Sequence, residues 1–327
     1  MKILYGIQLT GNGHITRSAE IIKSLKARGI EVDIITSGHN SQIELPFQVK
    51  RHHKGISFHY NKKNGGIDWI KTINPADIID MLRDIRYDSS GYDIVISDFE
   101  PISAYSARRH NIKSIGIGNQ YAFSSKDMPR PKRKDALSEA FLRNFAKCDF
   151  YIPIGYKKYD GSITPPVIGE ALLNRKTSEE DFYLVYLPSL SAKYITDCIE
   201  AYGQGNWRIY SPGTEAETEL GRSTIKRPDK SEFAEDLLRC KGVITAAGFS
   251  TTSEALVLKK KLWSIPIKGQ YEQLCNSIAL KEMGVFTEPF SQQAIAKWVG
   301  EYESAEYEWE NPIEEIVEKI IRFNEEN

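Results

Sequence analysis

Strand and helix patterns alternate along this sequence, and this alternation limits its fold more than any other feature. In the first half, buried-strand patterns cover 2–8, 31–38, 92–99 and 112–120, and helical patterns cover 15–29, 77–87 and 102–111. Strands that alternate with helices through short turns are typical of a parallel, doubly wound α/β sheet.

The same alternation starts again in the second half of the chain. Strand patterns cover 182–189, 207–212, 242–248 and 261–267, and helical patterns cover 192–203, 231–240, 250–260 and 273–284. A length of 327 residues is sufficient for two such domains. The sequence therefore predicts tandem α/β domains over 1–160 and 182–311, a hinge over 161–181, and a final amphipathic helix over 312–327.

Composition and cysteine usage indicate a globular cytoplasmic protein. Hydrophobic residues make up 41% of the chain and charged residues 27%, and no run of about 18 apolar residues could span a membrane. The N-terminal stretch reaches Gly and polar residues too early for a signal peptide. The four cysteines are widely spaced without a CxxC pair, so we expect reduced thiols and no metal site.

The net charge of −1 hides a difference between the two halves. Residues 1–155 carry 23 Lys+Arg against 16 Asp+Glu, and residues 156–327 carry 20 against 28. A basic first half is suited to an anionic acceptor or an anionic membrane surface, and ordinary drift in composition explains the difference equally well. We expect no nucleic-acid partner.

The first candidate site is the turn after the first strand. Gly11 and Gly13 let the backbone turn tightly and approach a ligand, and His14 follows at the start of a helix. In a doubly wound sheet, ligands bind beyond the carboxyl ends of the strands, where Asp98 also lies. His14 could therefore act as a general base oriented by Asp98, or it could simply cap its helix. A dinucleotide site is disfavoured, because the loop lacks the third glycine of the G-x-G-x-x-G fingerprint.

The second candidate site begins where a strand ends at Gly248. Ser250 and Thr251 start a helix whose free N–H groups and dipole favour a diphosphate, and Glu254, one turn further in, could accept both hydroxyls of a ribose. The loop 269–273 then supplies Gln270, Glu272 and Gln273, which are suited to sugar hydroxyls. The alternative for each piece is an ordinary helix start followed by a polar loop.

Together these motifs resemble the GT-B nucleotide-sugar glycosyltransferases. The resemblance covers nearly the whole chain through GNGHITR, SDFEP, AAGFSTTSEAL and GQYEQLCNSIAL. It is closest to the branch that contains the lipid-II-forming N-acetylglucosaminyl transferase and the UDP-glycosyltransferases, within a little-characterised prokaryotic group. It implies two Rossmann-like domains with the active site in the cleft between them, the acceptor on the first domain, the donor on the second, and the 312–327 helix crossing back to the first.

The resemblance also implies roles for the motif residues. His14 would be the catalytic base and Asp98 its partner. The donor-binding residues would be Gly13, Arg227, Gly248, Ser250, Thr251, Glu254, Gln270, Glu272 and Gln273. The reaction would be an inverting, metal-independent hexosyl or N-acetylhexosaminyl transfer to a hydroxyl of a lipid-linked or polysaccharide acceptor. It would use a nucleotide sugar, UDP-linked by expectation, as co-substrate and no cofactor. The E-x7-E pattern of the retaining branch is absent, since Leu262 stands eight residues after Glu254.

The stretch 124–148 bears on the acceptor. It places Lys132, Arg133 and Lys134 ahead of a helix that contains Phe141. Basic residues beside apolar ones can bind the inner face of an anionic membrane, which would suit a lipid-linked acceptor with a free hydroxyl. The alternative is a solvated loop followed by a helix docked through its Phe side chains.

Two other functions fit this type of fold. A nucleotide-sugar 2-epimerase would share the fold but would need further acids and histidines in the cleft. A non-catalytic nucleotide-sugar-binding protein would need no base, so His14 and Asp98 argue against it.

Overall fold

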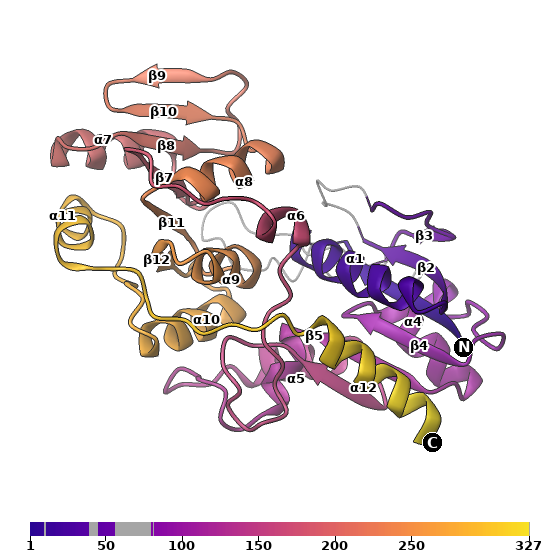
Figure 1. Ribbon diagram of the computed structural model, residues 1–327. Coiled ribbons are helices and arrows are strands. Elements are labelled where there is room, and N and C mark those ends of the chain that lie inside the picture. Colours follow the sequence, from indigo (N-terminus) through magenta and orange to yellow (C-terminus); the bar gives the residue numbers. More distant parts are fainter. Residues whose placement is uncertain (10, 39–44, 56–79, 81, 327) are drawn as a thin grey trace.

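Two six-stranded sheets organise the computed structural model, which describes residues 1–9, 11–38, 45–55, 80 and 82–326 (Figure 1). Each sheet forms its own α/β lobe, and the two lobes lie side by side in Figure 1. The predicted fold class of two tandem Rossmann-like domains is confirmed.

The first sheet is entirely parallel. Its strands, in spatial order, are β3 (Arg51–His53), β2 (Glu31–Ser37), β1 (Lys2–Gln8), β4 (Ile94–Asp98), β5 (Ser114–Gly118) and β6 (Phe150–Pro153). Its helices are α1 (Asn12–Ala27), α4 (Pro101–His110), α5 (Ala136–Asn144) and the 3₁₀ helix η1 (Asn119–Ser124). The central strands β1 and β4 are buried almost throughout, which explains their nearly continuous apolar sequences.

Local sequence signals set the ends of these helices. The Glu100 side chain accepts hydrogen bonds from the N–H groups of Ile102 and Ser103, and Pro101 occupies the first turn of α4. Helix α1 ends just before Gly29, which has a φ of 75°, a conformation that glycine adopts without strain. These signals fix α1 and α4 directly after the strands β1 and β4.

The second sheet is parallel except for one edge strand. Its strands, in spatial order, are β12 (Lys261–Ile265), β11 (Gly242–Ala246), β7 (Tyr183–Tyr186), β8 (Trp207–Tyr210), β10 (Ser223–Lys226) and the antiparallel β9 (Thr218–Leu220). Its helices are α7 (Ala192–Tyr202), α8 (Lys230–Arg239), α9 (Phe249–Val257), α10 (Tyr271–Glu282) and α11 (Gln292–Glu301).

Several elements differ from the sequence expectation. Helix α1 begins at Asn12, three residues earlier than expected, so that His14 lies in its first turn. The segment expected to be a hinge contains the short helix α6 (Glu170–Leu173). The strands β3, β6, β9 and β10 and the helix α11 had no predicted counterpart. Of the helix expected over 77–87, residues 80 and 82–84 are helical, and 77–79 and 81 lie outside the described residues.

The final helix, α12 (Ile313–Glu326), follows the second lobe in sequence but packs on the first (Figure 1). Its buried face consists of Ile316, Val317 and Ile320. Arg28, just beyond α1, forms ion pairs with Glu314 and Glu318 of α12. The chain therefore crosses between the lobes twice.

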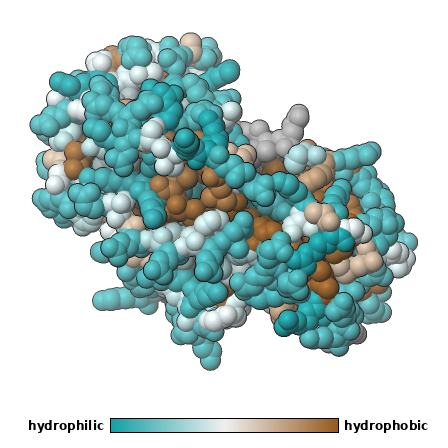
Figure 2. Space-filling model, viewed as in Figure 1, coloured by the Kyte–Doolittle hydropathy of each residue, from teal (hydrophilic) through white to brown (hydrophobic). Residues whose placement is uncertain are grey.

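Polar contacts join the lobes around the space between them. The hydroxyls of Tyr156 and Thr252 are 2.7 Å apart, and the Tyr271 hydroxyl donates to Glu139 Oε1 at 2.7 Å. Figure 2 shows apolar side chains gathered in the middle of the visible face, where the lobes meet, within a mainly hydrophilic surface. No described helix combines the length and the apolar composition that a membrane span requires.

Candidate active site between the two sheets

The strand order of the first sheet creates a crevice between β1 and β4. The chain continues from β1 toward β2 on one side and from β4 toward β5 on the other. Such a reversal of direction leaves a ligand-binding crevice beyond the carboxyl ends of the two strands. Asp98 is the last residue of β4, and His14 lies in the helix that follows β1. The topology therefore brings both predicted residues to this crevice.

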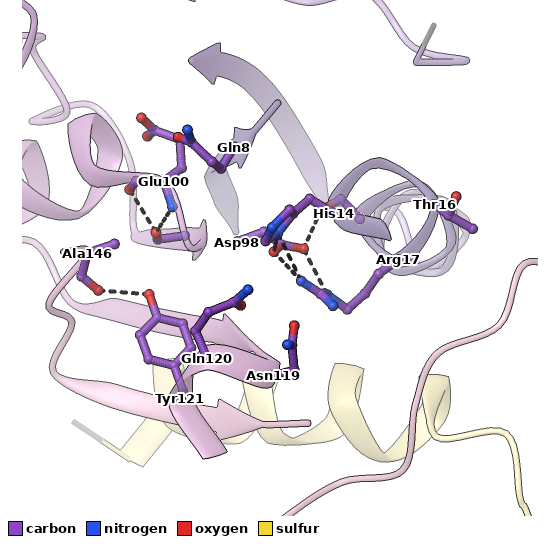
Figure 3. Close-up of polar contacts among 12 residues, drawn as sticks. Gln8, His14, Thr16, Arg17, Asp98, Glu100, Asn119, Gln120, Tyr121 and Ala146 are labelled. Atoms are coloured by element: carbon purple, nitrogen blue, oxygen red, sulfur yellow. Dashed lines mark hydrogen bonds and ion pairs between the residues drawn. The ribbon is translucent and has the colours of Figure 1, made fainter. Parts of the chain in front are cut away.

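His14 and Asp98 are in direct contact. His14 Nδ1 lies 2.7 Å from Asp98 Oδ1, and the Asp98 side chain is completely buried (Figure 3). Burial alone would raise the pKa of Asp98, but the adjacent Arg17 and His14 bring it below its ordinary value. Asp98 is therefore an ionised carboxylate that can only accept hydrogen bonds.

Two further side chains of α1 bind the same carboxylate. Arg17 donates from Nε to Asp98 Oδ2 at 2.9 Å and from Nη2 to Oδ1 (Figure 3). The Ser18 hydroxyl donates to Asp98 Oδ2 at 2.8 Å. Burial would lower the pKa of Arg17, but the charge of Asp98 and its hydrogen bonds raise it, so the guanidinium stays charged. Asp98 thus has donors on both of its oxygens.

This arrangement assigns the tautomer of His14. Since Asp98 is an acceptor, the 2.7 Å contact requires the proton of the neutral imidazole to be on Nδ1. Nε2, on the far side of the ring, is then the unprotonated nitrogen, and the contacts of His14 with described residues are made through Nδ1. A neutral ring of this kind can accept a proton through Nε2.

Phe99 lies in a strained turn beside the histidine. Its φ of 52° is unusual for a bulky residue, and it separates Asp98 from Glu100, which caps α4. The Phe99 ring is stacked on the His14 ring, with centroids 6.4 Å apart and planes at 11°. It therefore provides an apolar contact for one face of the imidazole.

The second sheet has an equivalent reversal between β7 and β11. Tyr186 ends β7, and α9 begins just after β11. A cavity of about 110 Å³ lies at this point, lined by Asn12, Gly13, Thr16, Tyr186, Tyr210, Pro228, Asp229, Lys230, Phe233, Ser250, Thr251 and Glu254. The lining comes from both lobes, since the first three of these residues belong to α1.

The start of α9 presents uncompensated donors at this cavity. Gly248 precedes the helix without a capping side chain, and the first turn contains no acidic residue. The first N–H groups of any helix lack partners within it, and its dipole attracts anions. The hydroxyl-bearing residues Ser250 and Thr251 line the same cavity, so this end of α9 is suited to a diphosphate.

Glu254 is a half-buried acid in the wall of the cavity. Burial raises its pKa to about 7, against the opposing charge of Lys230. No described residue donates a hydrogen bond to its carboxylate, whereas Lys230 donates to the Thr16 hydroxyl at 3.2 Å. Glu254 is therefore available to accept hydrogen bonds from a ligand.

Gly13 allows the two lobes to approach closely. A Cβ atom at this position would lie 1.8 Å from Ser250 Oγ and 3.0 Å from Ser250 Cβ. Any side chain would have to displace Ser250 or separate α1 from α9. The predicted Gly13 is therefore required by a close contact between α1 and the start of α9.

Glu272, at the start of α10, faces the histidine site from the second lobe. Asn119 Nδ2 donates to Glu272 Oε1 at 2.6 Å, and Gln120 Nε2 lies 3.5 Å from Oε2. Burial raises the pKa of Glu272, although Asn119, His14, Gln120 and Arg17 oppose the shift. Gln120 Oε1 is buried and accepts no hydrogen bond within the described structure, so a ligand hydroxyl could satisfy it (Figure 3).

Other predicted residues occupy different positions. Gln273 Oε1 accepts a hydrogen bond from the Ile267 N–H at 3.0 Å and so holds the loop before α10. Gln270 is the residue directly before α10, and its side chain makes no capping hydrogen bond to the helix. Arg227 is exposed and does not line the cavity.

The basic stretch divides into an exposed part and a docked part. Lys132, Arg133 and Lys134 are exposed. Phe141 points inward, and its ring centroid lies 4.9 Å from that of Phe145. Phe141 is therefore a partly buried residue that packs against the core of the first lobe.

Several residues of the site were not predicted from the sequence. Arg17 lies three positions after His14, a spacing that places two helical residues on one face, and this signal could have found it. Asn119 and Gln120 directly follow the carboxyl end of β5. A position at the carboxyl end of a strand is what indicated Asp98, so the same signal could have found them. In the described ranges, no group of three or more His, Cys, Asp or Glu is placed to hold a metal ion.

Comparisons with known proteins agree with this architecture. Residues 1–301 match the sequence pattern of the family described as Glycosyl transferase family 1. A search of curated protein sequences finds no match. The likeness to solved structures shows the fold, because the identities are low.

Three of these solved structures span nearly the whole chain. The glycosyltransferase SnogD from Streptomyces nogalater is 14% identical, with a TM-score of 0.55 over 100% of this chain and 95% of that one. Arabidopsis thaliana UGT89C1, complexed with UDP-L-rhamnose, is 13% identical, with a TM-score of 0.59 over 98% and 94%. Phytolacca americana UGT2, complexed with UDP-2fluoro-glucose and pterostilbene, is 14% identical, with a TM-score of 0.59 over 99% and 94%.

Proposed function

The chain belongs to glycosyl transferase family 1, and we propose that it transfers a sugar from a UDP-linked donor to an acceptor hydroxyl with inversion at the anomeric carbon. The observation that carries this proposal is the His14–Asp98 contact of 2.7 Å at the crevice of the first sheet. Through this contact the neutral tautomer of His14 has its unprotonated nitrogen at Nε2, to which no described residue hydrogen-bonds, and deprotonation of a hydroxyl requires such a nitrogen.

The proposed reaction exchanges one bond at the anomeric carbon and transfers one proton. The acceptor oxygen attacks the anomeric carbon while its proton moves to His14 Nε2. The bond between that carbon and the diphosphate oxygen breaks, and the nucleoside diphosphate leaves from the opposite face. Inversion follows from this single displacement.

The second lobe would hold the donor. The free N–H groups at the start of α9, with Ser250 and Thr251, would bind the diphosphate and stabilise its charge as it leaves. Glu254 would accept the ribose hydroxyls, and Glu272 would take part in sugar recognition. The solved complexes of UGT89C1 with UDP-L-rhamnose and of UGT2 with UDP-2fluoro-glucose support UDP as the nucleotide here.

For the acceptor, we propose a lipid-linked molecule reached at an anionic membrane surface. The exposed Lys132, Arg133 and Lys134 support this, together with Leu137, whose side chain is 83% exposed at the start of α5. We expect the chain to co-sediment with anionic vesicles at low salt, and a triple substitution of the three cations by Gln to abolish this. Equal recovery with neutral and anionic vesicles would contradict the membrane proposal and leave the transfer reaction unaffected.

The test of the proposed function is a panel of nucleotide sugars. UDP-, GDP- and dTDP-linked hexoses and N-acetylhexosamines are offered to the full chain, and nucleoside diphosphate release, sugar epimers and thermal stability are measured. Release of UDP from one donor, slow with water and faster with a suitable acceptor, supports the proposal. Interconversion of the sugar without release would indicate a 2-epimerase, and stabilisation without any turnover would indicate a binding protein.

A further inference from the structure

A buried arginine shares its carboxylate partner with the histidine of the site. Arg17 is only 4% exposed, and its guanidinium contacts both oxygens of Asp98. Its Nη2 also lies 3.1 Å from His14 Nδ1 (Figure 3). Since Nδ1 already donates to Asp98, this last contact places a positive charge beside the ring without a hydrogen bond between them.

We propose that Arg17 is a positioning residue for the base: it holds the Asp98 carboxylate in place and cancels its charge, so that His14 stays a neutral proton acceptor. This inference rests on the proposed function, because it concerns the histidine assigned there as the base. It assigns Arg17 a role that a histidine–aspartate pair alone does not contain.

The charges around the His14 ring determine how readily it takes up a second proton. A buried aspartate on its own would favour the protonated imidazolium, which cannot accept the acceptor's proton. With Arg17 bound to it, Asp98 belongs to a pair with no net charge, and a second proton on His14 would lie next to a guanidinium. Among the described residues, Glu272 of α10 also interacts electrostatically with the ring, and Tyr5 of β1 interacts with Arg17.

The geometry of the Arg17–Asp98 contact also fixes the orientation of the carboxylate. The planar guanidinium matches a carboxylate through two parallel hydrogen bonds, and Ser18 occupies the remaining position on Oδ2. Asp98 therefore cannot rotate away from His14. A lysine at position 17 could keep the positive charge but could not reproduce this two-point contact.

The test compares Arg17→Met, Arg17→Lys and wild-type protein by ¹⁵N-histidine NMR and by the pH dependence of turnover. In Arg17→Met, we expect the His14 ring to take up its second proton at a pH higher by roughly one unit or more. Turnover near neutral pH should then fall about tenfold and recover at higher pH. Arg17→Lys should titrate like wild type, with a loss of kcat that is the same at every pH.

Arg28→Met is the matched control, because Arg28 adjoins the same helix as Arg17. Its substitution also removes ion pairs with carboxylates that are distant in sequence, those of Glu314 and Glu318. It should change neither the titration nor the pH profile. If Arg17→Met does not fold, Arg17→Gln removes the charge while keeping a donor for Asp98. An unchanged His14 titration in the neutral variant, with activity lost equally at every pH, would reduce Arg17 to a structural role.

Failure of the proposed function gives a different result. If His14→Ala turns over like wild type, the base assignment is wrong, whatever Arg17 does. The NMR titration needs no substrate, so it tests the effect of Arg17 on the ring independently.

Discussion

At the scale of single residues, the donor cavity contains a carboxylate, that of Glu254, whose ionised form is disfavoured by burial. Glu254 is a half-buried carboxylate in the donor cavity to which no described residue donates a hydrogen bond. Burial raises its pKa from 4.5 to about 7, so keeping it ionised at neutral pH costs folding free energy. A ribose that donates two hydroxyl hydrogens would offset that cost.

Glu254→Gln should therefore stabilise the empty protein and weaken donor binding. Between pH 4.5 and about 7, folded Glu254 holds a proton that the unfolded chain has released, so the free energy of unfolding falls as pH rises. The glutamine variant avoids this loss and should gain about 1–3 kcal/mol at pH 8 but nothing near pH 4.5. Its affinity for UDP should fall about tenfold.

Urea unfolding at both pH values and calorimetric titration with UDP measure these two effects. The exposed Glu215 provides the control, because Glu215→Gln should change neither quantity. A Glu254→Gln variant that is less stable than wild type at pH 8 would contradict the account of Glu254.

At the scale of elements, the site depends on where two helices begin. Gly13 is the second residue of α1, and it lies against Ser250, which is in the first turn of α9. This contact lets residues from both lobes line one cavity. A small residue at the start of α1 is thus as important to the site as its polar groups.

Gly13→Ala should reduce UDP affinity about tenfold or more while leaving stability nearly unchanged. The new Cβ would collide with Ser250, whereas alanine is otherwise the better helix residue. Gly13→Ala should reduce UDP affinity less in a Ser250→Ala background than in the wild-type background, and a double-mutant cycle measures this difference. Gly11→Ala is the control, since its nearest contact would be His14 Cδ2 at 4.0 Å and its φ of −166° suits any residue. Equal UDP binding by Gly13→Ala and wild type would contradict the close-contact explanation.

The elements were also the most predictable part of the molecule. Strands buried on both faces, such as 2–8 and 242–248, are long apolar runs, and the doubly wound topology follows from their alternation with helices. The exposed edge strand β9 has no such pattern, because nothing packs on it. Arg17 was missed although a local signal was present, since it stands three positions after His14 on the same helix, and the sheet topology had already placed Asp98 beside His14.

At the scale of the whole molecule, the two lobes divide the chemistry between them. The first contributes His14 with its partners, and the second contributes the start of α9, Glu254 and Glu272. The crossing of α12 back to α1 and the hydrogen bonds of Glu272 and Tyr271 across the interface hold the two halves together. Substitutions of His14 and its partners in the first lobe should therefore affect proton transfer without changing donor binding, and substitutions of the site residues of the second lobe should weaken donor binding.

The most direct test of this account is the turnover and donor affinity of His14→Ala with the nucleotide sugar identified by the panel. We predict a loss of turnover of about 10²-fold or more with an unchanged dissociation constant for the donor, because the base lies on the first lobe and the donor site on the second. Turnover equal to that of wild type would contradict the central claim that His14 deprotonates the acceptor.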